Sequence, residues 1–405
     1  MRHLNSIRIY CLMACAMMVA GCSQQTAQQT DTQRWVGTWG TAVQLTEPHN
    51  CPPEPGISGN TIRQKIRVSI GGETVRLKLS NEFGNDVLKI AAVSLAPALE
   101  GSKIDASKAV NVLFGGKQAI DIEKGKSVIS DALQFALTPR MDVAVTIAYT
   151  FVPSDITGHP GSRTTSYILT GNELNNTDFA DAVTTDHWYT IERLDVVADE
   201  PTAAIAIVGN SITDGRGSTT NKVNRWTDVF SERLLANPAT SKLAVLNMGI
   251  GGNCVIRGGL GPNASVRFNR DVIEQPGVKY VILFEGVNDM GYSPNPSMTE
   301  KELIAAYSKM IDTAHAHGLK IYGATVTPFK ECFYGSPEKE DCRLAVNNWI
   351  RTCGKFDAVI DFEKAICSTS DTTVMNPDLH DNDNLHPNAN GHKALGEFVD
   401  LKLFE

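Results

Sequence analysis

The stretch that decides the fold reads Ala203-Ala-Ile-Ala-Ile-Val-Gly-Asn-Ser-Ile-Thr-Asp-Gly215. Its first half is an unbroken run of small and β-branched apolar residues, which predicts a buried strand. The second half changes abruptly to glycine and short polar residues, which favour a turn. Trp226, Phe230 and Leu234 then recur at helical spacing. Ser211 is therefore expected on a strand-to-helix turn, at the edge where open α/β sheets bind their ligands.

The same alternation of strand, loop and helix continues to the end of the chain. Further apolar strands are predicted at 243–246, 280–284, 321–326 and 358–362. Helices are predicted from Thr299, where Thr299 and Glu302 form a capping box, to Gly318, and at 344–351 and 391–401. Five strands alternating with helices predict a parallel sheet with helices on both faces, within a domain spanning 199–405.

Residues 35–198 have a different pattern and are predicted to form a separate β-rich domain. Residues 61–70 alternate, with Ile62, Ile66 and Val68 on one face, and Gly71-Gly72 then turns the chain into a second strand. Residues 141–149 alternate again. Short alternating strands separated by glycine, asparagine and aspartate predict an antiparallel β-sandwich.

The first residues have the pattern of a targeting signal. A weakly basic start and a short apolar segment end at Val19-Ala-Gly-Cys22, which resembles the lipobox of bacterial lipoproteins. The resemblance implies removal of 1–21, lipid attachment at Cys22, and a flexible tether over 22–34. Ser23 after the cysteine favours the outer membrane of a Gram-negative cell as the destination. The alternative is a plain secretory signal with an incidental cysteine.

Cysteines and charge limit the classes of partner. The six cysteines after Cys22 would form disulfides in an oxidising compartment, and Cys332 with Cys342 is the first pairing we expect. No Cys-x-x-Cys motif occurs, so a zinc site is not indicated. The net charge is −8 and no basic patch stands out, which makes nucleic acid an unexpected partner.

Polar residues that follow the predicted strands suggest a nucleophile and its base. Ser211 is the candidate nucleophile, because a serine hydroxyl on this turn is exposed and has a helix amino terminus behind it. His386 is the candidate base, and Asp383, three residues earlier, can orient its imidazole. His380 and His392 are rival bases, but His380 has no carboxylate three residues before it, and His392 falls in the last predicted helix.

Acyl transfer also needs hydrogen-bond donors for an oxyanion. The backbone amide of Ser211 can supply one, and the amide of Gly252, in a glycine loop after the second strand, can supply another. Gly251 is adjacent and competes for that assignment. Asn288 can supply a side-chain amide, although Asn288 and Asp289 could instead cap the segment that follows them. This chemistry needs neither a metal nor another cofactor.

Together these segments resemble the four conserved blocks of the SGNH, or GDSL, hydrolase superfamily. The resemblance covers about 201–405 and rests on Gly209-Asn-Ser-Ile-Thr-Asp-Gly215, the loop at Gly252, Gly286-Val-Asn-Asp289 and Asp383-Asn-Leu-His386. It implies a flavodoxin-like three-layer α/β/α fold and a serine esterase that uses Ser211, Gly252, Asn288, Asp383 and His386 as above. One position departs from the family pattern, because Asn210 stands where Asp is usual.

Trp35-Val-Gly-Thr-Trp39 and Ser80-Asn-Glu-Phe-Gly84 ahead of these blocks resemble a secreted two-domain branch that includes esterases of xylan degradation. The resemblance implies acetyl or other small acyl esters on plant polysaccharide as substrate. Trp39 and Arg163 are candidate substrate contacts in the amino-terminal domain, although buried aromatic residues more often belong to a core. The alternatives are a lysophospholipase or thioesterase, and a glycan-binding lipoprotein without activity.

Overall fold

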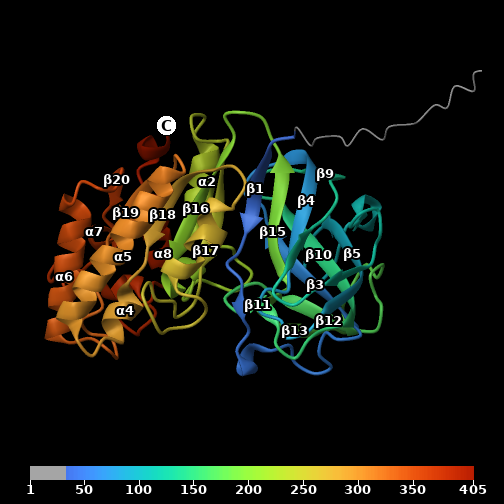
Figure 1. Cartoon of the computed structure of the whole chain (residues 1–405), viewed down its shortest axis with the longest axis horizontal. Coiled ribbons are helices and arrows are strands. Elements are labelled where there is room, and N and C mark those ends of the chain that lie inside the picture. The colour runs from blue at the N-terminus through green and yellow to red at the C-terminus, as the bar shows by residue number, and fades with distance from the viewer. Residues whose placement is uncertain (1–32) are drawn as a thin grey trace, which may run out of the picture. The chain divides into compact units, whose positions relative to one another are not determined.

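The computed structural model describes residues 33–405. In the carboxy-terminal half, five parallel strands form one sheet in the order β17-β16-β18-β19-β20 (Figure 1). Counted along the chain from β16, this order is the flavodoxin-like 2-1-3-4-5. The predicted flavodoxin-like parallel sheet is therefore confirmed. The strand bounds are β16 (Ala203–Gly209), β17 (Leu243–Gly249), β18 (Val278–Phe284), β19 (Lys320–Ala324) and β20 (Ala358–Ile360).

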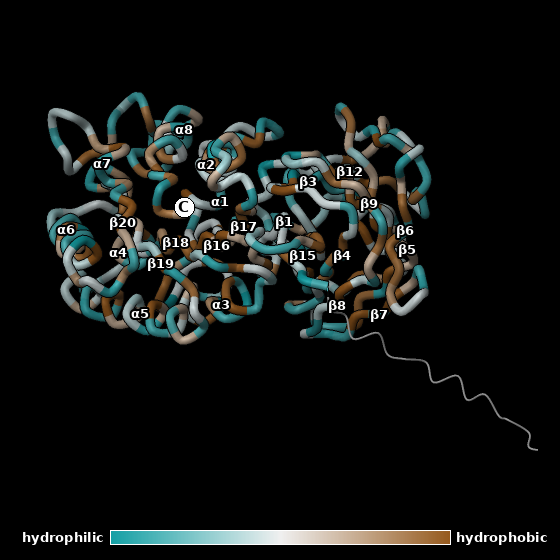
Figure 2. The backbone as a smooth tube through the Cα atoms, turned by 90° about the horizontal axis from the view of Figure 1, so that it is seen from above, coloured by the Kyte–Doolittle hydropathy of each residue, from teal (hydrophilic) through white to brown (hydrophobic). Residues whose placement is uncertain are grey.

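Helices cover both faces of this sheet, as Figure 2 shows from above. Ile205 and Ile207 of β16 pack with α2, α7 and α8, whereas Ala206 and Val208 pack with α3, α5 and α6. Because successive strand residues point to opposite faces, an apolar run without alternation is what burial on both faces requires. The helices are α1 (Ser211–Asp214), α2 (Trp226–Ala236), α3 (Ala264–Phe268), α4 (Val287–Gly291), α5 (Pro296–Ala316), α6 (Pro337–Thr352), α7 (Phe362–Ile366) and α8 (Ala389–Phe398).

The start of α5 differs from the prediction. The helix begins at Pro296, three residues before the expected capping box. Asn295 caps it by accepting a hydrogen bond from the Met298 amide at 3.3 Å, and proline at the first helical position is preset for a helix. The Thr299 hydroxyl instead shares a hydrogen bond of 2.6 Å with Ser293, so it closes the preceding loop.

The amino-terminal half contains two antiparallel sheets around one core and a small third sheet. Their strand orders are β1-β15-β4-β8 with β9 beside β4, β13-β12-β3-β10-β5-β6 with β7 beside β5, and β14-β11-β2. The strands are β1 (Trp35–Gly40), β2 (Gln44–Leu45), β3 (Asn60–Arg67), β4 (Gly72–Ser80), β5 (Leu88–Pro97), β6 (Val110–Val112), β7 (Ile120–Ile122), β8 (Ser127–Ile129), β9 (Leu133–Leu137), β10 (Asp142–Phe151), β11 (Thr157–His159), β12 (Ser166–Thr170), β13 (Val183–Thr185), β14 (Trp188–Tyr189) and β15 (Ile191–Val197).

The turn at Gly71 and Gly72 joins two sheets rather than two paired strands. β3 belongs to the seven-stranded sheet and β4 to the five-stranded sheet. Ile62 and Ile66 of β3 then share one apolar cluster with Val75 and Leu77 of β4. The alternating pattern on either side of the turn therefore marks two faces that pack against each other, as in a sandwich.

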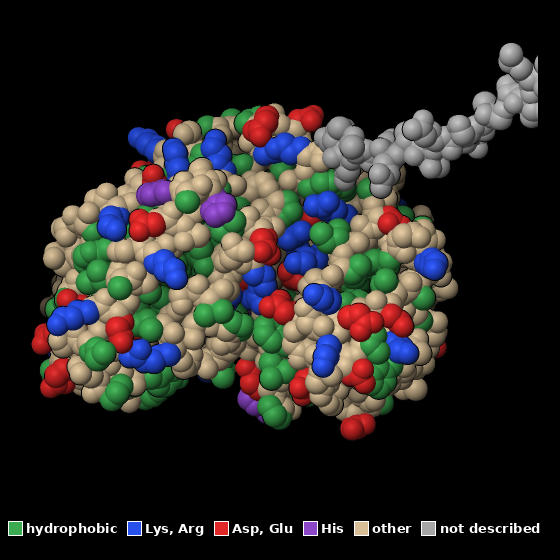
Figure 3. All heavy atoms as spheres, viewed as in Figure 1, with side chains coloured by type: hydrophobic (Ala, Val, Ile, Leu, Met, Phe, Trp, Pro, Cys, Tyr) green, Lys and Arg blue, Asp and Glu red, His purple; other side chains and the backbone are tan. Residues whose placement is uncertain are grey.

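The two halves meet along β1 and β17, and residues 34–405 form one compact unit. A parallel β-bridge joins Thr41, just after β1, to Asn247 of β17. The apolar core of the sandwich extends to Leu246 and Met248 of β17. Around this seam, Figure 3 shows acidic and basic side chains intermixed near the centre of the view. The predicted division between 198 and 199 falls in the connection from β15 to β16.

The six cysteines at 51, 254, 332, 342, 353 and 367 are free thiols, so the predicted Cys332–Cys342 disulfide is wrong. Both side chains are buried, but they face different neighbours. Cys342, on α6, lies near Glu300, whereas Cys332 lies near the backbone of Tyr334 and Gly335. Burial raises the pKa of both thiols, that of Cys342 to about 11.

The targeting signal and Cys22 lie outside the described residues. Within 33–405, no helix combines the length and the apolar character needed to cross a bilayer.

Candidate active site

Ser211 is the first residue of α1, directly after the carboxyl end of β16. The Asn210 side chain caps α1 by accepting a hydrogen bond of 3.0 Å from the Ile212 amide. This turn presents Ser211 Oγ 2.8 Å from His386 Nε2, and His386 Nδ1 lies 2.6 Å from Asp383 Oδ2. The three side chains that were predicted to act together are thus hydrogen-bonded in series, although Ser211 and His386 are 175 residues apart in the sequence.

Asp383 sets the state of the imidazole. Its Oδ1 accepts hydrogen bonds from the backbone amides of Leu385 at 3.0 Å and His386 at 2.8 Å. Burial raises the pKa of Asp383, but the hydrogen bonds from the side chain and backbone of His386 outweigh burial and lower it to about 2. An ionised carboxylate can only accept, so Nδ1 carries the proton and Nε2 is free to accept the Ser211 hydroxyl proton.

The rival histidines have other partners. His392, on α8, accepts a hydrogen bond from the Trp226 amide through Nδ1 and donates from Nε2 to the Arg216 carbonyl. Its burial lowers its pKa to about 4, so it is a neutral structural residue. His380 Nδ1 accepts a hydrogen bond of 3.3 Å from the Asn384 amide within its own loop.

The predicted oxyanion donors line the same cavity as Ser211. The Ser211 amide opens a helix, where backbone N–H groups have no intrahelical acceptor. Gly252 has φ +69°, a left-handed conformation that suits glycine. Asn288 donates one amide hydrogen to the Asn253 carbonyl at 2.8 Å, which leaves its second hydrogen for a ligand. Gly251 also lines the cavity, so the choice between the two glycines stays a prediction.

Asn210, the departure from the family pattern, faces a buried glutamate that sequence reasoning missed. Asn210 Nδ2 donates to Glu285 Oε2 at 3.0 Å, and the Gly286 amide donates to the same oxygen at 2.9 Å. Glu285 Oε1 is buried and has no partner within 33–405. Burial, followed by the nearby charge of Asp289, raises the pKa of Glu285 to about 8. An aspartate at 210 would place a second carboxylate against Glu285, whereas the amide donates to it.

Glu285→Gln is expected to remove part of the pH dependence of folding stability. The folded pKa of about 8 lies above the ordinary value of 4.5, so Glu285 contributes fully at low pH and loses its contribution between those values. The loss amounts to a few kcal/mol, because each pKa unit corresponds to about 1.4 kcal/mol. Urea unfolding between pH 4 and 9 should show that the free energy of unfolding of the variant rises relative to that of the wild type as pH rises. Equal pH dependence of the two free energies would contradict the prediction.

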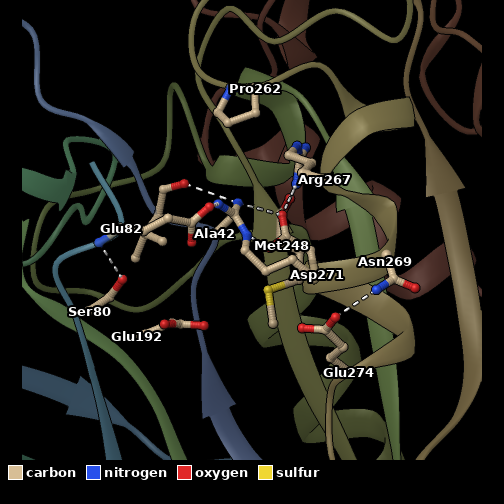
Figure 4. A network of polar contacts seen from close by, with 12 residues as sticks. Ala42, Ser80, Glu82, Glu192, Met248, Pro262, Arg267, Asn269, Asp271 and Glu274 are labelled. Atoms are coloured by element: carbon tan, nitrogen blue, oxygen red, sulfur yellow. Dashed lines mark hydrogen bonds and ion pairs between the residues drawn. The ribbon is translucent and has the colours of Figure 1, made fainter. Parts of the chain in front are cut away.

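Arg267, on α3, holds the backbone on both sides of the site, and nothing in the local sequence indicates it. Its fully buried guanidinium donates to the Gly209 carbonyl at 3.0 Å, the Met248 carbonyl at 2.6 Å and Asn253 Oδ1 at 2.9 Å. Asp271 is its counter-ion at 2.8 Å (Figure 4). The residue therefore ties the end of β16, the end of β17 and the loop after Gly252 to one group.

The same network reaches the amino-terminal half. Arg270 contacts Asp271 at 2.6 Å and Glu82 at 2.8 Å, and it donates to the Val43 carbonyl at 3.0 Å. Burial raises the pKa of Asp271, but the charges of Arg270 and Arg267 lower it below its usual range overall. The ion pairs thus continue from the sandwich to the loops around Ser211.

Asp214, at the end of α1, binds the amino-terminal half directly. His159 Nε2 lies 2.8 Å from Asp214 Oδ1, and His159 Nδ1 lies 2.8 Å from the Ala42 carbonyl. Because a carbonyl oxygen only accepts, His159 Nδ1 donates to Ala42, and Nε2 faces the Asp214 carboxylate. Gly161 packs so closely on the Asp214 carboxylate that a Cβ there would overlap it. Asp214 therefore links the turn that carries Ser211 to the amino-terminal half.

A cavity of about 340 Å³ opens over Ser211 and His386. Its walls come from both halves of the chain. Arg163, a predicted substrate contact, lines it. Trp39 does not: it is buried in β1, packs edge-on against Trp188 with ring centres 5.1 Å apart, and lines a separate cavity of about 80 Å³. Its place in the sandwich core explains why the structure does not bring it to the nucleophile.

Among residues 33–405, no three His, Cys, Asp or Glu side chains lie together in a way that could hold a metal ion. The polar groups that converge at Ser211 are instead a hydroxyl, an imidazole, a carboxylate and amide donors. This set can move a proton, provide a nucleophile and bind a developing oxyanion, which are the requirements of acyl transfer.

Comparison with known proteins gives a family match that covers these residues. Residues 207–394 match the GDSL-like lipase/acylhydrolase family. No curated protein matches the chain significantly. Similar solved structures include an acetyl xylan esterase from Geobacillus stearothermophilus, at 21% identity over 50% of this chain and 94% of that one, with a TM-score of 0.38. Another is a GDSL-like lipase from Bacteroides thetaiotaomicron, at 16% identity over 51% and 90%, with a TM-score of 0.38. Residues 207–394 are thus similar to the GDSL-like lipase/acylhydrolase family, as the sequence blocks around Ser211, Gly252, Asn288 and His386 predict.

Proposed function

We propose that the chain is a serine ester hydrolase that removes acetyl or other small acyl groups from carbohydrate through an acyl-enzyme. The observation that carries the proposal is the 2.8 Å contact between Ser211 Oγ and His386 Nε2 inside a cavity with many polar side chains. Gln44, Asn50 and Glu47 on its wall suit a polyhydroxylated alcohol better than an acyl chain of many carbons.

The mechanism follows from the positions of the donors and acceptors. His386 Nε2 takes the hydroxyl proton as Ser211 Oγ attacks the ester carbonyl, and Asp383 stabilises the resulting imidazolium. The carbonyl oxygen becomes an oxyanion that accepts hydrogen bonds from the amides of Ser211 and Gly252 and from Asn288 Nδ2. Collapse breaks the ester bond, and the Nε2 proton passes to the sugar oxygen. Water, deprotonated by His386 Nε2, then attacks the acyl carbon; the bond to Ser211 Oγ breaks, Oγ takes the proton back from Nε2, and the acid is released.

Exposed aromatic side chains support a sugar ligand. Phe333 is 77% exposed and Tyr292 is 59% exposed, and both line the cavity. Exposed apolar rings beside a reactive group are typical of a binding surface. Flat apolar faces of this kind suit the C–H face of a sugar ring, which would place an acylated hydroxyl next to Ser211.

A fluorophosphonate probe separates an esterase from a binding protein. We expect labelling of the wild type and none of Ser211→Ala. Acetate release from acetylated xylan, compared with fatty-acid release from a lysophospholipid, then separates the substrate classes. Labelling that persists without Ser211 would refute the nucleophile, and faster release of fatty acid would refute the carbohydrate substrate.

We also propose that the protein is an exported lipoprotein, anchored through Cys22 to the outer membrane of a Gram-negative cell. The support is the lipobox-like Val19-Ala-Gly-Cys22 and the tether-like composition up to Arg34. Mass spectrometry of the mature amino terminus tests this, because a diacylglyceryl cysteine is expected there and should be lost in Cys22→Ser. An unmodified wild-type terminus would contradict it.

A further inference from the structure

The arginines of the described chain divide into two groups. Of the fifteen at positions 33–405, thirteen donate side-chain hydrogen bonds to acceptors of the protein. Guanidinium groups have five donors and are usually paired when a carboxylate is within reach. The paired set is Arg34, Arg63, Arg67, Arg76, Arg140, Arg193, Arg225, Arg233, Arg257, Arg267, Arg270, Arg343 and Arg351.

The two remaining arginines, Arg163 and Arg216, line the same cavity, and it is the one that contains Ser211 and His386. Neither side chain makes an ion pair or a hydrogen bond with any residue in 33–405. For Arg163 the Nε atom is buried from solvent and still lacks a protein acceptor. A buried donor without an acceptor is costly unless a ligand supplies one.

Both arginines have backbones that are held in place. Arg163, in the loop between β11 and β12, has φ +49°, and its carbonyl accepts a hydrogen bond of 3.0 Å from the Asn221 amide. A long side chain rarely adopts this conformation, and such outliers concentrate at functional sites. Arg216 donates from its amide to the Ser211 carbonyl at 2.8 Å and accepts from His392 at 2.9 Å. The two stems thus enter the cavity from opposite halves of the chain.

The carboxylates of the cavity are committed to other groups. Glu47 accepts hydrogen bonds from Gln44 at 2.5 Å and Asn50 at 3.0 Å. Asp214 is bound to His159 at 2.8 Å. The protein as a whole carries a net charge of −8, so two unpaired guanidinium groups in one cavity contrast with its surroundings. Arg216 is exposed to solvent, whereas the buried Arg163 Nε lacks a partner that an anion from outside can supply.

We propose that Arg163 and Arg216 bind a carboxylate of the substrate, so that the esterase prefers acylated saccharides that carry an acidic group. This inference rests on the proposed function for the position of the ester at Ser211. A carboxylate matches the forked donors of a guanidinium. The carboxylate has two possible sources, a uronate in the sugar and a free carboxyl at the end of the acyl group. The two sources place the charge on opposite sides of the scissile ester.

Binding to Ser211→Ala tests the site without turnover. We expect a xylo-oligosaccharide with a glucuronate branch to bind about tenfold or more tightly than the unbranched oligosaccharide of equal length, because charge-assisted hydrogen bonds are the stronger ones. Adding Arg163→Gln and Arg216→Gln should abolish this preference. Arg34→Gln, which removes an equal charge near Glu200, is the matched control and should preserve it. Isothermal titration calorimetry measures binding to all three proteins.

Turnover identifies the source of the carboxylate. One pair of substrates is acetylated xylo-oligosaccharide with and without glucuronate, and the other is monoethyl succinate with ethyl butyrate. The charged-to-neutral ratio of kcat/KM should fall about tenfold or more in the double arginine variant for one pair only. Equal ratios in wild type and variant for both pairs, together with equal binding, would overturn the inference. If no ester is hydrolysed, the proposed function fails, and the binding experiment still decides whether the two arginines bind a uronate.

Discussion

Ser211→Ala is expected to lower kcat for a small acetyl ester by roughly 10⁴ to 10⁶, with the fold intact. In the proposed mechanism the Ser211 hydroxyl forms the acyl-enzyme, and its 2.8 Å contact with His386 is the route for its proton. His386→Ala should cost about as much, because Ser211 and His386 act as a unit. The double variant should therefore be no slower than either single variant. Initial rates on 4-nitrophenyl acetate, measured at several enzyme concentrations, give these values.

His317→Ala is the matched control. His317 is exposed at the end of α5, where its Nδ1 faces the Thr313 carbonyl at 2.9 Å. Its removal should leave kcat within about twofold, since surface substitutions of this kind change little. Additive losses in the Ser211 and His386 double variant would mean that another base serves Ser211.

Arg267→Met is expected to lower the free energy of unfolding by about 3–5 kcal/mol, which is the usual cost of breaking a buried ion pair from one side. The change removes donors from the Gly209 and Met248 carbonyls and from the Asn253 side chain, all inside the protein. Asp271 keeps Arg270 as a partner, at 2.6 Å, which limits the loss. Urea denaturation followed by tryptophan fluorescence measures the change.

Arg257→Met provides the comparison for this prediction. Its ion pair with Glu302 has an exposed arginine, at 65% of its side-chain surface, so solvent screens the pair and its loss is expected to change the free energy of unfolding far less than the loss of Arg267 does. Activity distinguishes a displaced loop from a loss of stability. At temperatures well below the unfolding midpoint, Arg267→Met should lower kcat more than it raises KM, because the loop that carries Gly252 and Asn253 loses its hydrogen bond to Arg267. A stable variant with unchanged kcat would show that the loop is held by other contacts.

The parallel sheet could be predicted because its signal is local. Residues 203–209 are apolar without interruption and end in a glycine turn. This one short stretch therefore indicates both that the strand is buried on two faces and where it ends. The contact between Asp383 and His386 is equally local, because the two residues lie three positions apart in one loop. That Ser211 meets them follows from the rule that carboxyl ends of parallel strands share an edge.

Other features could not be predicted because their partners are distant in sequence. The contact of His159 with Asp214 joins the two halves, and neither residue has a neighbour that indicates it. The sequence does not distinguish a Trp39 that contacts a sugar from a Trp39 in the hydrophobic core, because its contact with Trp188 is visible only in the structure. The sequence alone does not distinguish a free thiol from a disulfide, and in the structure both Cys332 and Cys342 are free.

The cavity wall has a consequence for how such enzymes diversify. The groups that make and break bonds all come from residues after 200, whereas Arg163, Glu47 and His187 come from the sandwich. Under the proposed function, mutations in the β11–β12 loop would therefore change substrate preference without altering a reacting group. The first half of the chain can therefore diverge in sequence while the second half keeps the reacting groups unchanged.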